Sequence, residues 1–256
     1  MRFHRADNLL FCSDNERDLD YVRAVSELVL ARYNGETYHW RPARSDELWR
    51  IFTGGRASVV GVRHAGRVAC VKLFYDDRWR TRIRTRLGLS KARRAYRNGL
   101  RLRTAGVLCP QMIGYAERRP TGPALLVTEL ITDAARIDHW LAQRGIGRDM
   151  AEALARSLRA MHDKGVCHLD LSPRNILVRQ RDGGFEFLMV DYEDARFASE
   201  IGRRQRIDNL HHLHERMAQC ASLRDRLRFL RFYAGREYRA YRQALRQRML
   251  RSPRNH

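Results

Sequence analysis

One loop and the strand after it constrain this 256-residue chain more than any other feature of its sequence. The loop, residues 168–175, reads HLDLSPRN, and the apolar residues 176–178 follow it at once. A second apolar run ends at Asp191. A proline stiffens the turn between Asp170 and Asn175. Two polar side chains are therefore predicted to stand on a short, rigid loop next to a strand.

These residues suit phosphoryl transfer. A hydroxyl that attacks a phosphate needs a carboxylate to orient it and accept its proton, and Asp170 can supply one. A metal that neutralises the phosphates needs hard oxygen ligands, which Asn175 and Asp191 can supply. The spacing H-x-D-x-x-x-x-N is typical of a kinase catalytic loop. A surface turn with incidental carboxylates is the alternative, but it does not explain why three spacings agree.

The composition is that of a globular protein, with 44% hydrophobic and 31% charged residues. No apolar run approaches the roughly 20 residues of a membrane span, and no signal-like apolar segment follows the first residues. Five scattered cysteines, without a C-x-x-C pair, predict neither a zinc site nor a disulfide framework and favour a reducing cytosol.

The net charge of +21 is the unusual value. It favours a phosphate-rich partner, which could be a nucleotide, a nucleic acid or an anionic membrane surface. An arginine-biased codon supply also explains it, because lysine occurs only at Lys72, Lys91 and Lys164. That bias makes Lys72, in a strand-like segment, a candidate for a specific role.

The first half of the chain predicts a helix followed by strands. Residues 18–32 have helical spacing, and we interpret them as a packing helix. Residues 51–62 read as strand, glycine turn and strand, in which Gly54 and Gly55 are expected to bring backbone amides close to phosphate oxygens. A plain hairpin would look the same.

The next predicted strand spans residues 68–74. Its alternation places Cys70 and Lys72 on one face. We expect Lys72 to reach the α- and β-phosphates and Cys70 to lie against the base. A lysine extending from a strand end into solvent is the alternative interpretation of Lys72.

A basic block follows, from Arg78 to Arg103, with no acidic residue in it. Ser90 is predicted to cap a helix within this block. In a kinase-like fold that helix supplies a glutamate to the strand lysine. Here Ala95 stands near the expected place, so Lys72 is held by another acid such as Asp191, or the ion pair is dispensable, or the enzyme is impaired.

The second half predicts a hinge and a helical region. Residues 124–131 form a strand whose backbone, around Glu129 to Ile131, is expected to hydrogen-bond the adenine. Helices are predicted for residues 136–145, for 150–163 and through the arginine-rich tail. For His211, His212 and His214 we expect surface or packing roles, since no carboxylate or cysteine completes a metal site.

With these residues in view, the chain resembles the lipopolysaccharide kinase (Kdo/WaaP) family of the protein-kinase-like superfamily. The similarity runs from about Thr53 to Leu213 and is most specific in residues 165–177 and at Asp191. Further matching segments are Lys72, residues 93–96 and 105–107, the hinge at 128–130 and the segment 208–210. The chain departs from the family at Ala95, where glutamate is usual, and at residues 192–193.

The resemblance implies an α+β, bilobal protein-kinase-like fold, with a small antiparallel sheet in residues 1–130 and a mostly helical lobe in residues 131–256. It implies phosphorylation of a Kdo or heptose hydroxyl of the lipopolysaccharide inner core. ATP and Mg²⁺ are the implied cofactors. The implied partner is an anionic core lipid, met by peripheral contact at the cytoplasmic face of the inner membrane; the oligomeric state is unknown.

Other functions remain open from the sequence. A pseudokinase-like nucleotide-binding scaffold would explain the missing glutamate. An atypical protein kinase would use the same loop. A nucleic-acid-binding protein would explain the charge, but it leaves Asp170, Asn175 and Asp191 without a role, and no recognition helix or stacking aromatic array is evident, so no nucleic acid is expected.

Overall fold

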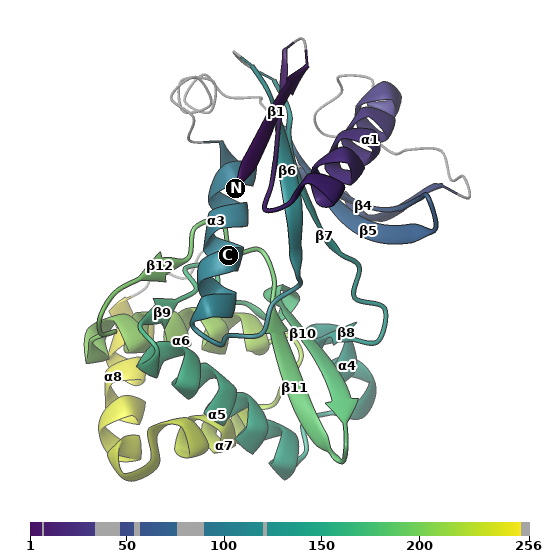
Figure 1. The fold of residues 1–256 in the computed structure, drawn as a ribbon. Coiled ribbons are helices and arrows are strands. Elements are labelled where there is room, and N and C mark those ends of the chain that lie inside the picture. The colour runs from purple at the N-terminus through teal and green to yellow at the C-terminus, as the bar shows by residue number, and fades with distance from the viewer. Residues whose placement is uncertain (7, 34–46, 54–56, 76–89, 120–121, 252–256) are drawn as a thin grey trace. The chain divides into compact units, whose positions relative to one another are not determined.

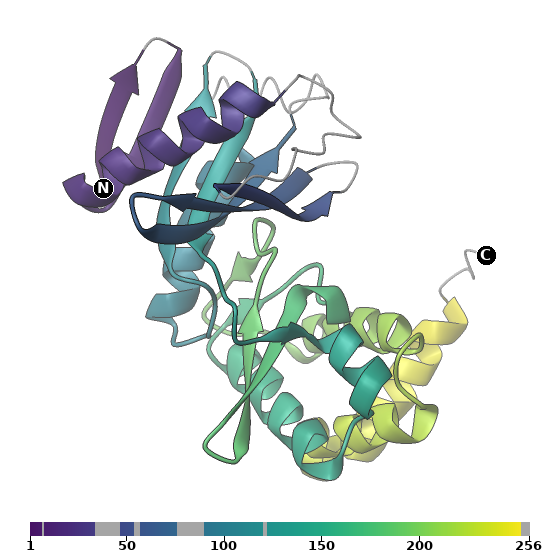
Figure 2. The ribbon, with the colours of Figure 1, turned by 90° about the vertical axis from the view of Figure 1, so that its right-hand side faces the viewer.

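Figures 1 and 2 show the computed structural model of the chain, which describes residues 1–6, 8–33, 47–53, 57–75, 90–119 and 122–251. The chain divides into two compact units. The first unit holds residues 1–101 and 110–132, and the second holds residues 102–109 and 133–256. The first contains an antiparallel sheet and the second is mainly helical, so the predicted α+β class is confirmed.

A seven-stranded sheet forms the centre of the first unit, in the order β1-β2-β6-β7-β5-β4-β3. Its strands are β1 (Arg2–Ala6), β2 (Leu9–Ser13), β3 (Leu48–Thr53), β4 (Ala57–His64), β5 (Arg67–Phe74), β6 (Met112–Arg118) and β7 (Ala124–Glu129). Every neighbouring pair is antiparallel. The strands predicted from residues 51–62 and 68–74 are thus confirmed, while Gly54 and Gly55 lie outside the described residues.

One face of the sheet is covered by α1 (Glu16–Arg32), which crosses the strands in Figure 2. This helix begins before the predicted residue 18 because the side chain of Asn15 accepts a hydrogen bond from the amide of Asp18 at 2.8 Å and so caps it. Val22, Val25 and Val29 are fully buried against the strands. The expected packing helix is therefore present.

The sequence did not predict the structure before residue 18. In the described part of that segment β1 and β2 pair with each other, and β2 pairs with β6 from Leu9↔Arg118 to Ser13↔Gly114. The sheet therefore gains two strands that were not predicted. The outer strand β1 is almost wholly exposed, which removes the alternating apolar pattern by which a strand is recognised.

Side chains of β5 alternate as predicted. Ala69, Val71 and Leu73 are fully buried on the α1 face, whereas Cys70 and Lys72 point to the other face and are partly exposed. On that second face Lys72 is in register with Leu126 of β7, which in turn pairs with Tyr115 of β6. A row of side chains therefore leads from Lys72 across three strands.

The helix α3 (Lys91–Thr104) packs at the end of this row, since the rings of Tyr96 and Tyr115 lie 5.4 Å apart. The predicted cap is confirmed, because the amide of Arg93 donates to Ser90 Oγ at 3.1 Å. Ala95 is buried, at 1% exposure. Lys72 and α3 thus share one face of the sheet, as a lysine–glutamate pair requires, but α3 carries no acidic side chain.

The second unit is built on helices. They are α4 (Ile137–Arg144), α5 (Arg148–Asp163), α6 (Arg203–Met217), α7 (Leu223–Ala234) and α8 (Tyr238–Arg251), with the short turns η1 (Pro173–Asn175) and η2 (Gly235–Glu237). The strands are β8 (Ala135–Arg136), β9 (Val166–Cys167), β10 (Ile176–Arg181), β11 (Gly184–Met189) and β12 (Arg196–Phe197). Met150, Leu154, Leu158 and Met161 are buried on α5, as predicted. Within the described ranges no helix is both long and apolar enough to cross a bilayer.

Gly165 joins α5 to the strand β9 that precedes the loop of residues 168–175. Its φ is +73°, and an added Cβ would overlap the backbone carbonyl of Ala198, whose amide donates to Gly165 at 2.9 Å. Gly183 has a similar φ, +78°, with open space around it. Both positions favour glycine, but only Gly165 combines this φ with a steric overlap.

We expect Gly165→Ala to be less stable than Gly183→Ala. Both variants incur the left-handed backbone cost of about 1–2 kcal/mol. Overpacking adds about 1–3 kcal/mol to Gly165→Ala alone. Urea unfolding of the two variants and the wild type measures the difference, and equal midpoints would contradict the overlap.

Candidate active site

The loop of residues 168–175 brings two of the predicted residues together. Asn175 Nδ2 donates to the backbone oxygen of Asp170 at 2.9 Å and to its Oδ2 at 3.1 Å. The turn η1 creates this proximity, because the Asn175 amide donates to the Ser172 carbonyl at 3.0 Å and Pro173 occupies the first helical position. Asn175 is only 8% exposed, so its orientation is fixed by packing as well as by hydrogen bonds.

Asp191 follows from the hairpin of β10 and β11. Ile176 pairs with Met189, and the amide of Val190 donates to the Asn175 carbonyl at 3.0 Å. Asp191 comes next, exposed and with a φ of +64°. A left-handed backbone at a residue other than glycine is uncommon and recurs at functional sites. The residue before Asp191 is therefore joined to Asn175 through the backbone.

His168 links the loop to Val190, the residue that follows β11. Its side chain is 2% exposed, and Nε2–H donates to the Val190 carbonyl at 2.8 Å. Burial lowers the pKa of His168, so the imidazole is neutral. Asn209 of α6 donates to the backbone oxygen of His168 at 2.6 Å. The loop is thus anchored on both sides, at Val190 and at Asn209.

The carboxylate of Asp170 is 63% exposed and meets a histidine that the sequence did not assign to the site. His212 Nε2 lies 3.1 Å from Asp170 Oδ1. The hydrogen bond from His212 holds the pKa of Asp170 below its ordinary value, against the opposing effect of partial burial. The expectation of a surface or packing role is therefore incomplete for His212.

The two neighbouring histidines fit that expectation. His211 is buried beside Glu215, at 3.5 Å, and burial lowers its pKa. His214 Nε2 lies 3.0 Å from an Arg226 nitrogen, and burial lowers its pKa to about 4. The three histidines lie on α6, but each side chain contacts a different group: Asp170, Glu215 or Arg226. Their spacing in the sequence does not reveal these partners.

The donor set at the loop suits a hard divalent cation. Both Nδ2 hydrogen bonds of Asn175 go to Asp170, which leaves Oδ1 of the amide as a possible ligand. Asp191 adds an exposed carboxylate. Mg²⁺ is commonly held by one or two side-chain oxygens, with phosphate and water oxygens completing six ligands. In the part of the chain that the structure describes, no cluster of three His, Cys, Asp or Glu residues forms a protein-only metal site.

The predicted nucleotide-binding residues that the structure describes lie in the first unit. The Lys72 ammonium lies 4.8 Å from the centroid of the Phe74 ring. Cys70 pairs with Thr128 across β5 and β7, and burial raises the pKa of its thiol to about 11, which keeps it uncharged. Such a thiol suits an apolar base.

The residues predicted to form the hinge lie at the end of β7 in the same sheet. The amide of Glu129 donates to the Gln111 carbonyl at 3.0 Å, and its carboxylate accepts from the Gln111 amide at 2.9 Å. The Glu129 carboxylate is therefore held by a backbone amide of the same unit. Ile131 follows β7 and is half-buried.

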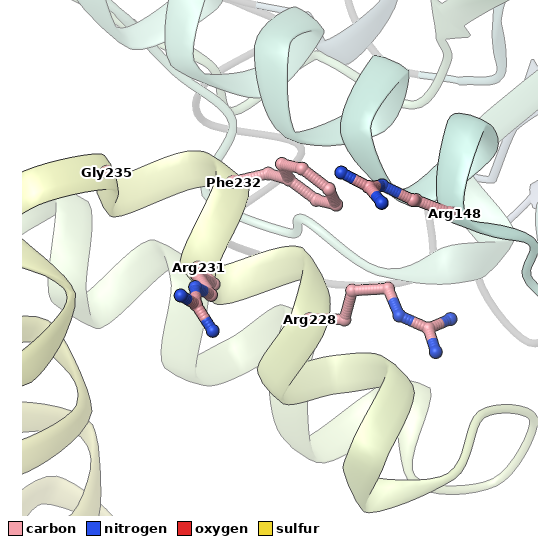
Figure 3. Close-up of a pocket in the computed structure, with 5 residues that line it drawn as sticks. All are labelled: Arg148, Arg228, Arg231, Phe232 and Gly235. Carbon is pink, nitrogen blue, oxygen red and sulfur yellow. The ribbon is translucent and has the colours of Figure 1, made fainter.

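A hollow of about 790 Å³ occurs elsewhere on the second unit, lined by Arg148, Arg228, Arg231, Phe232 and Gly235 (Figure 3). Arg148 begins α5, whereas His162 in its last turn bonds Asn209, which holds the loop. The two ends are roughly 20 Å apart at 1.5 Å per residue. In Figure 3 the three guanidinium groups point in different directions. This hollow is therefore separate from the loop, and its arginines do not converge on one ligand.

The chain is similar in sequence to known proteins. Residues 54–233 match the lipopolysaccharide kinase (Kdo/WaaP) family. The chain is 33% identical over 116 residues to 3-deoxy-D-manno-octulosonic acid kinase of Pasteurella multocida, covering 44% of this chain and 48% of that protein. The kinase of the same name from Mannheimia succiniciproducens is 27% identical over 117 residues, with the same coverage. The matched segments thus span about half the length of these curated relatives.

A solved structure of WaaP in complex with acyl carrier protein has a similar fold, with a TM-score of 0.57. The similarity covers 80% of this chain and 87% of that chain at 21% identity. At this identity the likeness concerns the fold alone, and the predicted protein-kinase-like fold is confirmed.

Proposed function

Because the chain belongs to the lipopolysaccharide kinase (Kdo/WaaP) family, we propose that it is an ATP-dependent kinase that phosphorylates a sugar hydroxyl of the lipopolysaccharide inner core, on Kdo or a heptose. The strongest support is that Asn175 bonds Asp170 through its side chain and Val190 through its backbone carbonyl, which joins the loop that carries Asp170 to the residue before Asp191.

In this proposal Asp170 orients the acceptor hydroxyl and takes its proton as the oxygen bonds to the γ-phosphorus and the bond to ADP breaks. Asn175 and Asp191 hold Mg²⁺, which neutralises charge on the phosphates when it is bound. The exposure of Asp170 supports this role, because an acceptor on a lipid must reach it from solvent.

The first unit binds the nucleotide in the same proposal. Lys72 contacts the α- and β-phosphates, Cys70 lies against the base, and the backbone from Glu129 to Ile131 hydrogen-bonds the adenine. Gly54 and Gly55 complete the phosphate contacts, although they lie outside the described residues. Because α3 has no acidic side chain, either another acid holds Lys72 or the ion pair is dispensable in this proposal.

The partner in this proposal is an anionic core lipid, reached by peripheral contact at the cytoplasmic face of the inner membrane. Arg97 and Arg101 are exposed on α3 and Arg93 is half-buried on it. Each such cation near an anionic surface contributes about 1 kcal/mol. Salt screens this attraction, so binding to anionic vesicles is expected to weaken as ionic strength rises.

A transfer assay tests the proposal. The purified protein is incubated with Mg²⁺, ATP and one acceptor at a time. The acceptors are a Kdo-bearing lipid, a heptose-bearing core lipid and a generic protein substrate, and mass spectrometry measures the mass of each product. We expect one phosphate to be added to one of the two lipids, and that lipid identifies the sugar. Phosphorylation of the generic protein substrate, with neither lipid modified, would favour an atypical protein kinase. A Mg²⁺-dependent thermal shift with ATP, but no transfer to any acceptor, would favour the nucleotide-binding scaffold.

A further inference from the structure

His212 and Asp170 lie 42 residues apart in the chain and meet at the candidate site. His212 Nε2 bonds Asp170 Oδ1 at 3.1 Å, while Asn175 Nδ2 bonds Oδ2 at 3.1 Å. Each oxygen of the carboxylate therefore holds one side-chain donor. We propose that His212 is a positioning residue that fixes the carboxylate plane of Asp170 for proton transfer. This inference rests on the proposed function and adds a residue to it.

The position of His212 is set by α6. Asn209, three residues earlier, lies on the same face of the helix and donates to the His168 carbonyl at 2.6 Å. The other end of the Asn209 amide, Oδ1, bonds His162 Nε2 of α5 at 2.8 Å. Asn209 and His212, three residues apart on α6, thus bond the loop at His168 and at Asp170. The helix is held against the loop independently of His212.

This arrangement leaves the base able to react. A carboxylate oxygen accepts more than one hydrogen bond, so the two donors leave lone pairs for a substrate hydroxyl. A side-chain contact this exposed contributes little to stability. A role in orienting the base therefore explains the contact better than a role in holding the fold.

Two substitutions at one position separate these roles. His212→Leu keeps the bulk but removes the donor, and we expect it to lower kcat about ten- to one-hundred-fold with KM for ATP unchanged. His212→Gln retains an N–H near the place of Nε2, and we expect it to recover most of that loss. His139→Gln, an exposed histidine of α4, is the matched control and should have wild-type kcat.

The proposal is overturned if His212→Leu keeps the wild-type kcat, or if Leu and Gln are equally impaired while both proteins melt at the wild-type temperature. A second measurement does not depend on turnover. The imidazole ¹⁵N–¹H signal of His212 should show a hydrogen-bonded Nε2–H in the wild type and lose that bond in Asp170→Ala. An unchanged signal overturns the contact itself, whereas absence of phosphate transfer by the wild type counts against the proposed function alone.

Discussion

Replacing Asp170 with asparagine is expected to lower kcat roughly 10²- to 10⁴-fold, the range over which a positioned base contributes. Asparagine has nearly the same shape, and its Oδ1 can still accept from His212. It cannot take the proton of an acceptor hydroxyl. Since Asp170 is 63% exposed and the Asn175 amide also bonds the backbone oxygen at this position, the loop should keep its structure. Steady-state kinetics with the lipid identified by the transfer assay measures the effect.

The matched control for this substitution is Asp182→Asn. Asp182 lies in the exposed turn between β10 and β11 with a φ of +43°, where asparagine is well tolerated. We expect wild-type kcat for the control and wild-type ATP affinity for both variants. A kcat for Asp170→Asn close to the wild-type value would remove Asp170 as the base. Loss of ATP affinity together with kcat would assign it to nucleotide binding instead.

The parts of the fold that the sequence predicted well are those whose signals are local. The alternation of β5 follows from Ala69, Val71 and Leu73, which are all buried. The core face of α5 follows from the helical spacing of Met150 and Leu154. In each case a period of two or of 3.6 residues reports which side faces the core. Asp170 and Asn175 belong to this class, because one short turn creates their contact.

The parts that escaped prediction depend on distant partners. The strand β1 has an exposed side chain at nearly every position, and it is a strand because β2 pairs with it at the sheet edge. His212 reaches Asp170 because Asn209 fixes α6 to the loop, a relation between segments far apart in sequence. The spacing of apolar residues along α6 does not indicate that contact. Local patterns therefore predicted the turn that joins Asp170 to Asn175 and the helix in the tail, but not the contact between that helix and the loop.

Acid should destabilise the second unit through His162, which is fully buried between α5, α6 and α7. Its Nδ1 lies 2.7 Å from the Tyr233 hydroxyl, and its Nε2 lies 2.8 Å from Asn209 Oδ1. Burial lowers the pKa of His162 from 6.5 to about 4. The folded state thus binds fewer protons than the unfolded state between these values. The stability is present above pH 6.5 and is lost as the pH falls toward 4.

The size of this effect follows from the shift. At 1.36 kcal/mol per pKa unit, His162 alone removes about 3 kcal/mol of unfolding free energy between pH 7 and pH 4. Because Asn209 also holds the His168 carbonyl, the same protonation should loosen the loop that carries Asp170. Urea unfolding followed by circular dichroism across this pH range measures the loss.

His162→Gln isolates this contribution, because glutamine can hydrogen-bond but cannot be protonated. We expect the variant to be less stable than the wild type at pH 7 by about 1–3 kcal/mol, since one amide cannot match both ring nitrogens. The difference in unfolding free energy between the two proteins should shrink toward pH 4. The wild type loses the contribution of neutral His162 there, whereas the variant has no such contribution to lose. His139→Gln, on the exposed surface of α4, should follow the wild-type pH curve. Parallel curves for His162→Gln and the wild type would show that His162 does not cause the acid sensitivity.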